Sequence, residues 1–160
     1  MNRDERHRRI ESYGTAPQRV AATLAQIPRE CWQFRPAPEE WSIHEQIIHL
    51  ADSEAYGYIR LRHGIAQPGS VVGAYNQEGW AKEMAYHAQN PDHALELFTW
   101  LRRVSYELIH ALPDEAWANT FEHPERGTLT LDDWLVTYDN HVTGHIAQMR
   151  ACYAAWHGAR

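Results

Sequence analysis

Apolar residues recur every three to four positions along several long stretches of this chain, and nothing alternates convincingly with period two. The first spacing places apolar side chains on one face of an α-helix, whereas a half-buried strand needs alternation. Four sizeable amphipathic helices with two long connections therefore predict an all-α fold, a four-helix bundle. Neither a repeat nor a low-complexity linker divides the sequence, so we expect residues 1–160 to form a single domain.

The first predicted helix of the bundle runs from about Thr15 to Ile27. Pro17 lies in its first turn, where the N–H that proline lacks would have no helical partner. One or two further helical turns, at about residues 3–13, are expected before it. Prolines at positions 28, 36 and 38 then impose an irregular connection.

The second predicted helix begins at Ser42, because Ser42 and Glu45 match a capping box, in which a hydroxyl and a carboxylate satisfy free backbone N–H groups. The Pro68-Gly69 pair marks its end. Residues 68–90 form the first long connection, and a short helix is expected in it between about positions 77 and 86.

The third predicted helix spans about residues 90–112, between a capping asparagine and Pro113. A second irregular connection follows, at residues 113–128. The fourth helix opens at Thr130, with Asp133 as its capping-box partner, and runs to about Trp156.

Composition and charge exclude several classes of partner and compartment. The net charge of −6 argues against nucleic acid or an anionic membrane as partner, and the basic residues near the start alternate with acids, as on a solvated helix face. A membrane span and a signal peptide are both disfavoured, because no sufficiently long apolar run occurs. Cys31 and Cys152 lie far apart and outside any CxxC pattern, which favours a reduced, cytoplasmic setting.

A pair of histidines gives the sharpest local signal. His141 and His145 are four residues apart, so they lie on one helical face, the spacing by which one helix offers two imidazoles to one metal ion. Chance is a real alternative in a chain with eleven histidines. Gly144 beside them leaves space for a ligand or for a neighbouring backbone, or is a neutral mid-helix glycine. The other members of this face are Trp134, Tyr138, Gln148 and Cys152, and the first three are candidates to line a pocket or to support the ligands.

A third ligand must come from another helix, and His49 is the best candidate. Glu45 and Asp52 are its neighbours at i−4 and i+3, so either carboxylate could orient its ring. On a helical wheel His49 lies beside the apolar stripe rather than at its centre, so periodicity alone makes it a flank residue. His44 competes weakly, since it lies nearer the end of the bundle.

Several short motifs follow one another in a recognisable order and spacing. They are Trp41-Ser42, His49-Leu50-Ala51-Asp52-Ser53-Glu54, Leu101-Arg102, His123-Pro124-Glu125-Arg126-Gly127-Thr128-Leu129-Thr130-Leu131 and His141-xxx-His145-xx-Gln148. With them the chain resembles the DinB/YfiT-like superfamily of small bacterial four-helix-bundle proteins, described as metal-dependent hydrolases, over about residues 15–156. The resemblance implies that His49, His141 and His145 bind one metal ion.

Three neutral imidazoles from two helices leave at least one coordination position open, which is typical of a reactive site. Zinc or nickel suits such a donor set. The first hypothesis is an enzyme acting on an unidentified small molecule, by metal-assisted hydrolysis or by transfer of a low-molecular-weight thiol, and the resemblance includes both activities. Glu45, Asp52 and Tyr138 are candidates for acid, base or substrate contact, and equally for capping, ligand orientation or core packing.

A second hypothesis is a metal-binding stress or interaction protein without turnover, in which part of the large aromatic content serves a homodimer face. An accessible pocket at the histidines favours the enzyme, and a plugged site favours the binding protein. A third hypothesis, a bundle with vestigial histidines, predicts no bound metal. The family name refers to DNA damage, but no basic groove with interleaved aromatic residues occurs, so we expect no nucleic-acid partner.

Overall fold

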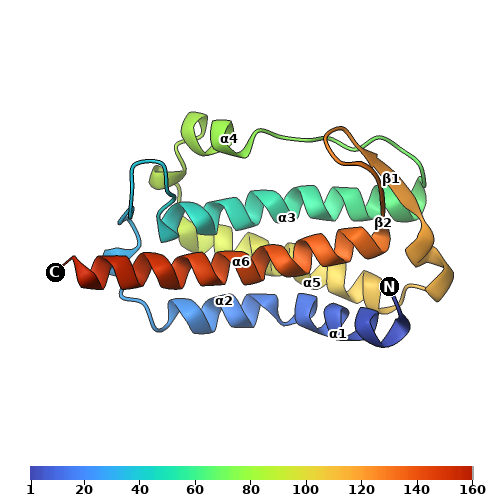
Figure 1. Ribbon diagram of the computed structural model, residues 1–160, viewed down its shortest axis with the longest axis horizontal. Coiled ribbons are helices and arrows are strands. Elements are labelled where there is room, and N and C mark those ends of the chain that lie inside the picture. The colour runs from blue at the N-terminus through green and yellow to red at the C-terminus, as the bar shows by residue number, and fades with distance from the viewer. Residues whose placement is uncertain (160) are drawn as a thin grey trace.

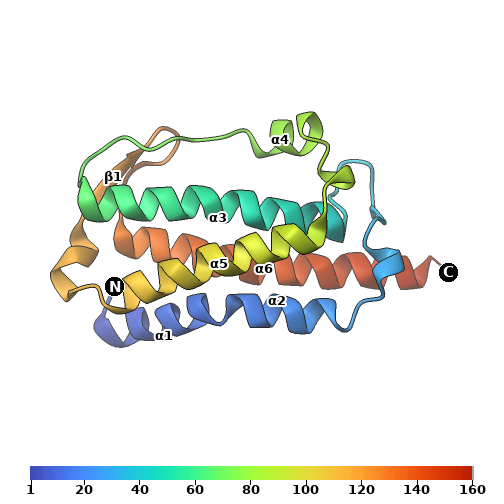
Figure 2. The ribbon, with the colours of Figure 1, turned by 180° about the vertical axis from the view of Figure 1, so that it is seen from behind.

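The structure of the protein is a computed structural model that describes residues 1–159. Its long helices form four rods that lie side by side, parallel or antiparallel to one another (Figure 1). The elements of these rods are α1 (Arg3–Gly14), α2 (Ala16–Leu24), α3 (Ile43–Ala66), α5 (Pro91–His110) and α6 (Leu131–Gly158). α1 and α2 follow one another along a single rod. α3 packs against both α5 and α6, and Figure 2 shows α5 crossing between α3 and the rod of α1 and α2. The predicted four-helix bundle is confirmed.

The predicted helix starts are present with their capping contacts. The Oγ of Ser42 accepts from the backbone N–H of Glu45 at 3.2 Å, and the Glu45 carboxylate accepts from the backbone N–H of Ser42 at 3.0 Å. Thr130 and Asp133 make the same reciprocal pair at the start of α6. These contacts satisfy backbone donors that the first turn leaves free, so each helix begins where its sequence predicts.

The junction of α1 and α2 differs slightly from the prediction. The helix expected to end at Ile27 stops at Leu24, and a 3₁₀ turn, η1 (Arg29–Cys31), follows Pro28. Thr15 joins the two helices, because its backbone N–H still bonds to the carbonyl of Glu11.

The second long connection is not irregular throughout. After the 3₁₀ turn η3 (Asp114–Ala118), strands β1 (Thr120–His123) and β2 (Gly127–Thr130) pair antiparallel, with Phe121 opposite Leu129. Burial does alternate along β1, with Phe121 and His123 facing inward. Because each strand has only four residues and one of the two inward residues of β1 is a histidine, the apolar pattern was too short to predict a strand. Gly127 takes φ of 72° in the turn, a conformation that favours glycine.

The first long connection runs along the outer side of α3 (Figure 1). It contains the expected short helix, α4 (Gln77–Glu83), and a 3₁₀ turn, η2 (Tyr86–Ala88). α4 ends before residue 86 because Ala85 adopts a left-handed backbone with φ of 49°. At its start the connection is tied to the hairpin, since the backbone N–H of Val72 donates to the carbonyl of Glu122 at 2.9 Å.

Two clusters of apolar side chains fill the bundle, one near each end. One contains Ile43, Ile47 and Val142, and the other contains Leu61 and Leu131. Between them α3, α5 and α6 contribute buried polar side chains: His49, Glu54, Arg102, Ser105 and His145. Because burying polar groups needs compensating partners, this middle layer is where a site is to be sought.

Two further expectations concern the cysteines and the membrane. Cys31 and Cys152 are both buried and carry free thiols. Of the helices within residues 1–159, none combines the length and the apolar character that crossing a bilayer requires.

Candidate metal centre

The middle layer brings His49, His141 and His145 together. The Nε2 atom of His141 lies 3.0 Å from that of His49 and 3.1 Å from that of His145. One ligand atom from each residue lies within 4.8 Å of the others. Nitrogen ligands at about 2.0–2.1 Å from a tetrahedral ion would lie roughly 3.3 Å apart, so the three rings need only a slight adjustment to share one cation.

The burial of α3 on all its faces explains why the helical wheel placed His49 beside the core and not in it. All residues from Ile43 to Ala51 are buried, on every face of the helix, and His49 is only 1% exposed. The outer side of α3 is covered by its flanking segments, and the ring of Trp41 lies 4.7 Å from that of His49. His49 is therefore buried although it lies beside the apolar stripe, because irregular segments of the chain cover this side of α3. The helical period of apolar residues cannot predict such a cover.

Burial keeps all three imidazoles neutral. Burial is the main reason that the pKa is lowered to about 3 for His49, about 2 for His141 and about 4 for His145, and neighbouring histidines of the group contribute to the first two shifts. Neutral imidazole is the form that binds metal ions. The three rings are thus in the ligand-competent state at neutral pH.

Two glutamines contact His145. The Oε1 of Gln46, on α3, lies 3.5 Å from Nδ1 of His145, and Gln148 also forms a hydrogen bond with this ring. The amide of Gln46 donates to the carbonyl of Trp41 at 3.2 Å, which turns its oxygen toward the histidine. An acceptor on Nδ1 leaves Nε2 free as a ligand. The sequence had indicated Gln148, but nothing in it indicated Gln46.

The expected carboxylate partners of His49 are engaged elsewhere. Glu45 completes the helix cap and forms an ion pair with Arg35, with Nε to Oε2 at 3.0 Å. Asp52 accepts from the hydroxyl of Tyr86 at 2.5 Å. Nδ1 of His49 is buried and has no hydrogen-bond partner anywhere in residues 1–159. Neither carboxylate orients this ring, because the turns of α3 direct both away from it.

Trp134 belongs to the core rather than to a pocket. It is 1% exposed, donates to the carbonyl of Gly57 at 2.9 Å, and its ring packs against Tyr13 and Tyr138. Tyr138 is also buried, but its hydroxyl accepts from Nη1 of Arg60 at 3.0 Å. Burial raises the pKa of Tyr138 to about 12, which makes it a poor general base near neutral pH.

A cavity of about 640 Å³ opens onto the three histidines. Trp41, Gln46, Gln148 and Cys152 also line it, whereas Glu45, Asp52, Trp134 and Tyr138 do not. Its carboxylates are instead Glu39, Glu40 and Glu78, and the last accepts from the indole N–H of Trp41 at 3.2 Å. The histidine site is therefore reachable by a small molecule, and no side chain of residues 1–159 plugs it.

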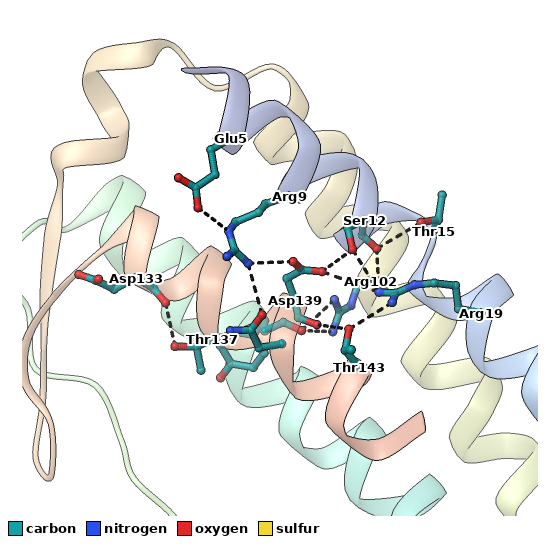
Figure 3. A network of polar contacts seen from close by, with 12 residues as sticks. Glu5, Arg9, Ser12, Thr15, Arg19, Arg102, Asp133, Thr137, Asp139 and Thr143 are labelled. Carbon is teal, nitrogen blue, oxygen red and sulfur yellow. Dashed lines mark hydrogen bonds and ion pairs between the residues drawn. The ribbon is translucent and has the colours of Figure 1, made fainter. Parts of the chain in front are cut away.

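A network of polar contacts connects α6 with α1 and α2 near the histidine pair (Figure 3). Asp139, two residues before His141, accepts from Nη1 of Arg9 at 3.1 Å and from the hydroxyl of Ser12 at 2.6 Å. Arg19 bonds to Thr143, between the two histidines, at 3.2 Å. These contacts anchor α6 to α1 and α2, so the His141–His145 turn has little freedom to rotate.

Fold and site together define a helical bundle with a trihistidine cluster shared by two antiparallel-packed helices. The sequence model of the DinB superfamily matches residues 13–149, and the chain belongs to that superfamily. Two curated relatives carry the name "putative metal-dependent hydrolase". One, from Oceanobacillus iheyensis, is 29% identical over 109 residues, and the other, YfiT of Bacillus subtilis, is 26% identical over 110 residues.

Each of these alignments covers 68% of this chain, but only 63% and 62% of the respective relative. Among solved structures, that of Bacillus subtilis YfiT covers 95% of this chain, and 87% of its own chain is matched, with a TM-score of 0.88 at 20% identity. The structure of a mycothiol-dependent maleylpyruvate isomerase matches 89% of this chain and 60% of the isomerase chain, with a TM-score of 0.71 at 14% identity. At such identities these likenesses show a shared fold.

Proposed function

We propose that His49, His141 and His145 bind one divalent metal ion, and that the chain is an enzyme using the coordination position they leave open. The observation that carries this proposal is the convergence of three neutral Nε2 atoms from two helices at the end of an accessible cavity. All-imidazole donors fit zinc or nickel. His49 and His145 are buried and His141 is half-buried, and their Nε2 atoms face mainly one another, so without an ion these ring nitrogens are poorly paired; a shared cation removes that cost.

The bound ion would supply Lewis acidity at the open position, for a water molecule, a carbonyl or a thiolate. The protein's own residues orient its ligands and limit the access of water. Gln46 fixes the tautomer of His145, and Trp41 covers the ring of His49. The names of the two curated relatives support hydrolysis, and the thiol-dependent isomerase of the same fold supports the use of a low-molecular-weight thiol.

The open cavity favours an enzyme over a metal-binding protein without turnover, because nothing in residues 1–159 fills the space in front of the histidines. A homodimer, a cytoplasmic location and the absence of a nucleic-acid partner stay predictions. A stress or interaction role would instead require a partner to close this cavity.

Metal binding and turnover test the proposal in two steps. Equilibrium dialysis with Zn²⁺ and Ni²⁺ should give one ion per chain, and His49→Gln, His141→Gln and His145→Gln should each lose it. His93→Gln, at an exposed histidine on α5, is the matched control and should keep it. The loaded protein should then turn over members of an ester and amide panel or of a thiol–electrophile panel. Stoichiometric binding without turnover in either panel would support the non-catalytic alternative.

A further inference from the structure

A second cavity, of about 770 Å³, adjoins the first on the other side of His141. His141 and Gln77 line both cavities. The second lies between α3, the segment before α4, the turn of the β-hairpin and α6. A molecule that reached the histidine cluster could therefore extend into this second space.

The two cavities carry opposite charge. The first is lined by three glutamates and by no lysine or arginine of the described chain. The second is lined by Arg60 and Arg126, and Glu125 is the one carboxylate among its lining residues within positions 1–159. Glu125 and Arg126 are both exposed in the hairpin turn, so water screens both charges, whereas Arg60 is half-buried. The field in the second cavity is thus positive, next to a cluster of neutral imidazoles.

Arg60 is held in position without a carboxylate partner among residues 1–159. Its Nη1 donates to the hydroxyl of Tyr138 at 3.0 Å and its Nη2 to the carbonyl of Gly73 at 2.6 Å. Its Nε is buried and has no hydrogen-bond partner in residues 1–159. A guanidinium has five N–H donors, so several remain available. Nη1 and Nη2 each use one N–H in these contacts, so each has a second N–H left for a ligand.

Arg126 approaches from the hairpin turn, and its Nη1 donates to Oγ1 of Thr137 on α6 at 3.1 Å. It too forms no ion pair with a carboxylate of the described residues. Thr137 and Tyr138 are consecutive on α6, and His141 follows one turn later. The two arginines are therefore tied to the same helix turn, immediately before a histidine of the cluster.

The charge near these arginines also affects His123, which lines the same cavity. Burial lowers the pKa of His123, and Arg60 and Arg126 lower it further, while Glu125 opposes them. The ring is thus neutral at neutral pH and does not compete for an anion as a cation. The positive charge of the cavity resides on the two guanidinium groups.

We propose that Arg60 and Arg126 form an oxyanion subsite, which selects substrates carrying a carboxylate or phosphate group beside the group that reacts at the histidine cluster. Guanidinium forks suit both oxyanions through charge-assisted hydrogen bonds, and both arginines line the same cavity. The proposal rests on the proposed metal-dependent function for the reacting end of the substrate. The subsite itself consists of side chains outside the histidine cluster.

A pair of metal-chelating probes tests this selection on the zinc-loaded protein. Succinic acid monohydroxamate carries a carboxylate tail, and its amide-ended analogue is neutral and nearly the same size. Calorimetric titration should show the acid binding roughly tenfold more tightly than the amide, since hydrogen bonds to charged groups are worth about that much. The ratio should fall to near one in Arg60→Gln and in Arg126→Gln.

Arg103→Gln is the matched control, because Arg103 is an exposed arginine on α5 that pairs with Glu107, away from both cavities. It removes the same charge and should leave the ratio near ten. Arg126 is exposed, so Arg126→Gln should fold even if loss of the Arg60 contacts unfolds the other variant. Equal affinity of acid and amide for the wild-type protein, or a ratio that falls equally in Arg103→Gln, would overturn the proposal.

A metal-free titration separates failure of the subsite from failure of the proposed metal function. Succinate and inorganic phosphate are added in turn to the apoprotein, and the side-chain Nε–H signals of Arg60 and Arg126 are followed by NMR. Saturable shifts of these signals support the subsite even if no hydroxamate binds, and the stronger of the two anions identifies the oxyanion class. Absence of shifts with either anion would refute the subsite whatever the metal result.

Discussion

Arg102 on α5 places its Nη2 atom 2.5 Å from Oε2 of Glu54 on α3, and neither side chain is more than 1% exposed. The hydroxyl of Tyr13 donates to the other oxygen of Glu54, also at 2.5 Å, and the guanidinium lies over the ring of Tyr13. Arg102 further donates to the carbonyl of Tyr138 on α6. One buried cation thus connects α1, α3, α5 and α6 in the layer that contains the histidines.

Arg102→Met should destabilise the fold strongly, because it leaves the Glu54 carboxylate buried without its partner. The expected loss is about 3–5 kcal/mol in urea unfolding. Adding Glu54→Gln removes the stranded charge and should restore part of the loss. Arg103→Met, next in the chain but exposed, should change stability by less than about 0.5 kcal/mol. Similar effects for the two arginines would contradict a buried ion pair.

Gln46→Leu should weaken metal binding without unfolding the protein. The substitution removes the amide oxygen that faces Nδ1 of His145, so the ring loses one of its orienting acceptors. Loss of such a partner typically costs about 10–100-fold in affinity. Competition with a chromophoric chelator measures it, and Gln18→Leu, at an exposed position on α2, is the control. Unchanged affinity in Gln46→Leu would assign the orienting role to Gln148 alone.

The metal-free protein should lose stability as the pH falls from about 6.5 towards 4. Folding lowers the pKa of the three histidines to about 3, 2 and 4, whereas unfolded imidazoles titrate near 6.5. The unfolded state therefore binds more protons in this window, and each ring contributes at most about 1.4 kcal/mol per pH unit. Urea unfolding should show a shallower pH slope for His49→Gln than for the wild type. An identical slope would mean that His49 is not buried as a neutral ring.

Of the two interpretations of Gly144, space for a ligand or backbone and a neutral mid-helix glycine, the structure favours the second. A Cβ at this position would meet no other atom of the described chain within 4 Å, and the residue is exposed. Gly144→Ala should therefore stabilise α6 by about 0.5–1 kcal/mol. Gly57→Ala is the contrasting variant, because its Cβ would lie 2.6 Å from Cε1 of buried Tyr138. Thermal unfolding should move in opposite directions for the two variants.

Helix positions and one half of the site could be predicted from the sequence, because both depend on local spacing. His141 and His145 belong to one helix, so their proximity follows from the helical period. His49 needed the family resemblance, since its burial arises from segments that cover α3 rather than from the apolar stripe. Gln46, three residues earlier, could not be assigned, because only the packing of α3 on α6 turns its amide toward His145.

The second cavity could not be predicted from the sequence, for a related reason. Arg60 and Arg126 are 66 positions apart, and the hairpin that carries Arg126 was expected to be irregular. A charged residue is normally interpreted as solvent-exposed, and no spacing rule brings these two together. Their placement depends on tertiary contacts with Thr137 and Tyr138 on α6.

The most direct test of the account is X-ray absorption spectroscopy at the zinc edge of the stoichiometrically loaded protein. We predict three imidazole nitrogen ligands at about 2.0–2.1 Å together with at least one further light-atom ligand, and one imidazole fewer in His49→Gln. A sulfur ligand, fewer than three imidazoles in the wild type, or a spectrum unaffected by His49→Gln would contradict a metal centre formed by His49, His141 and His145.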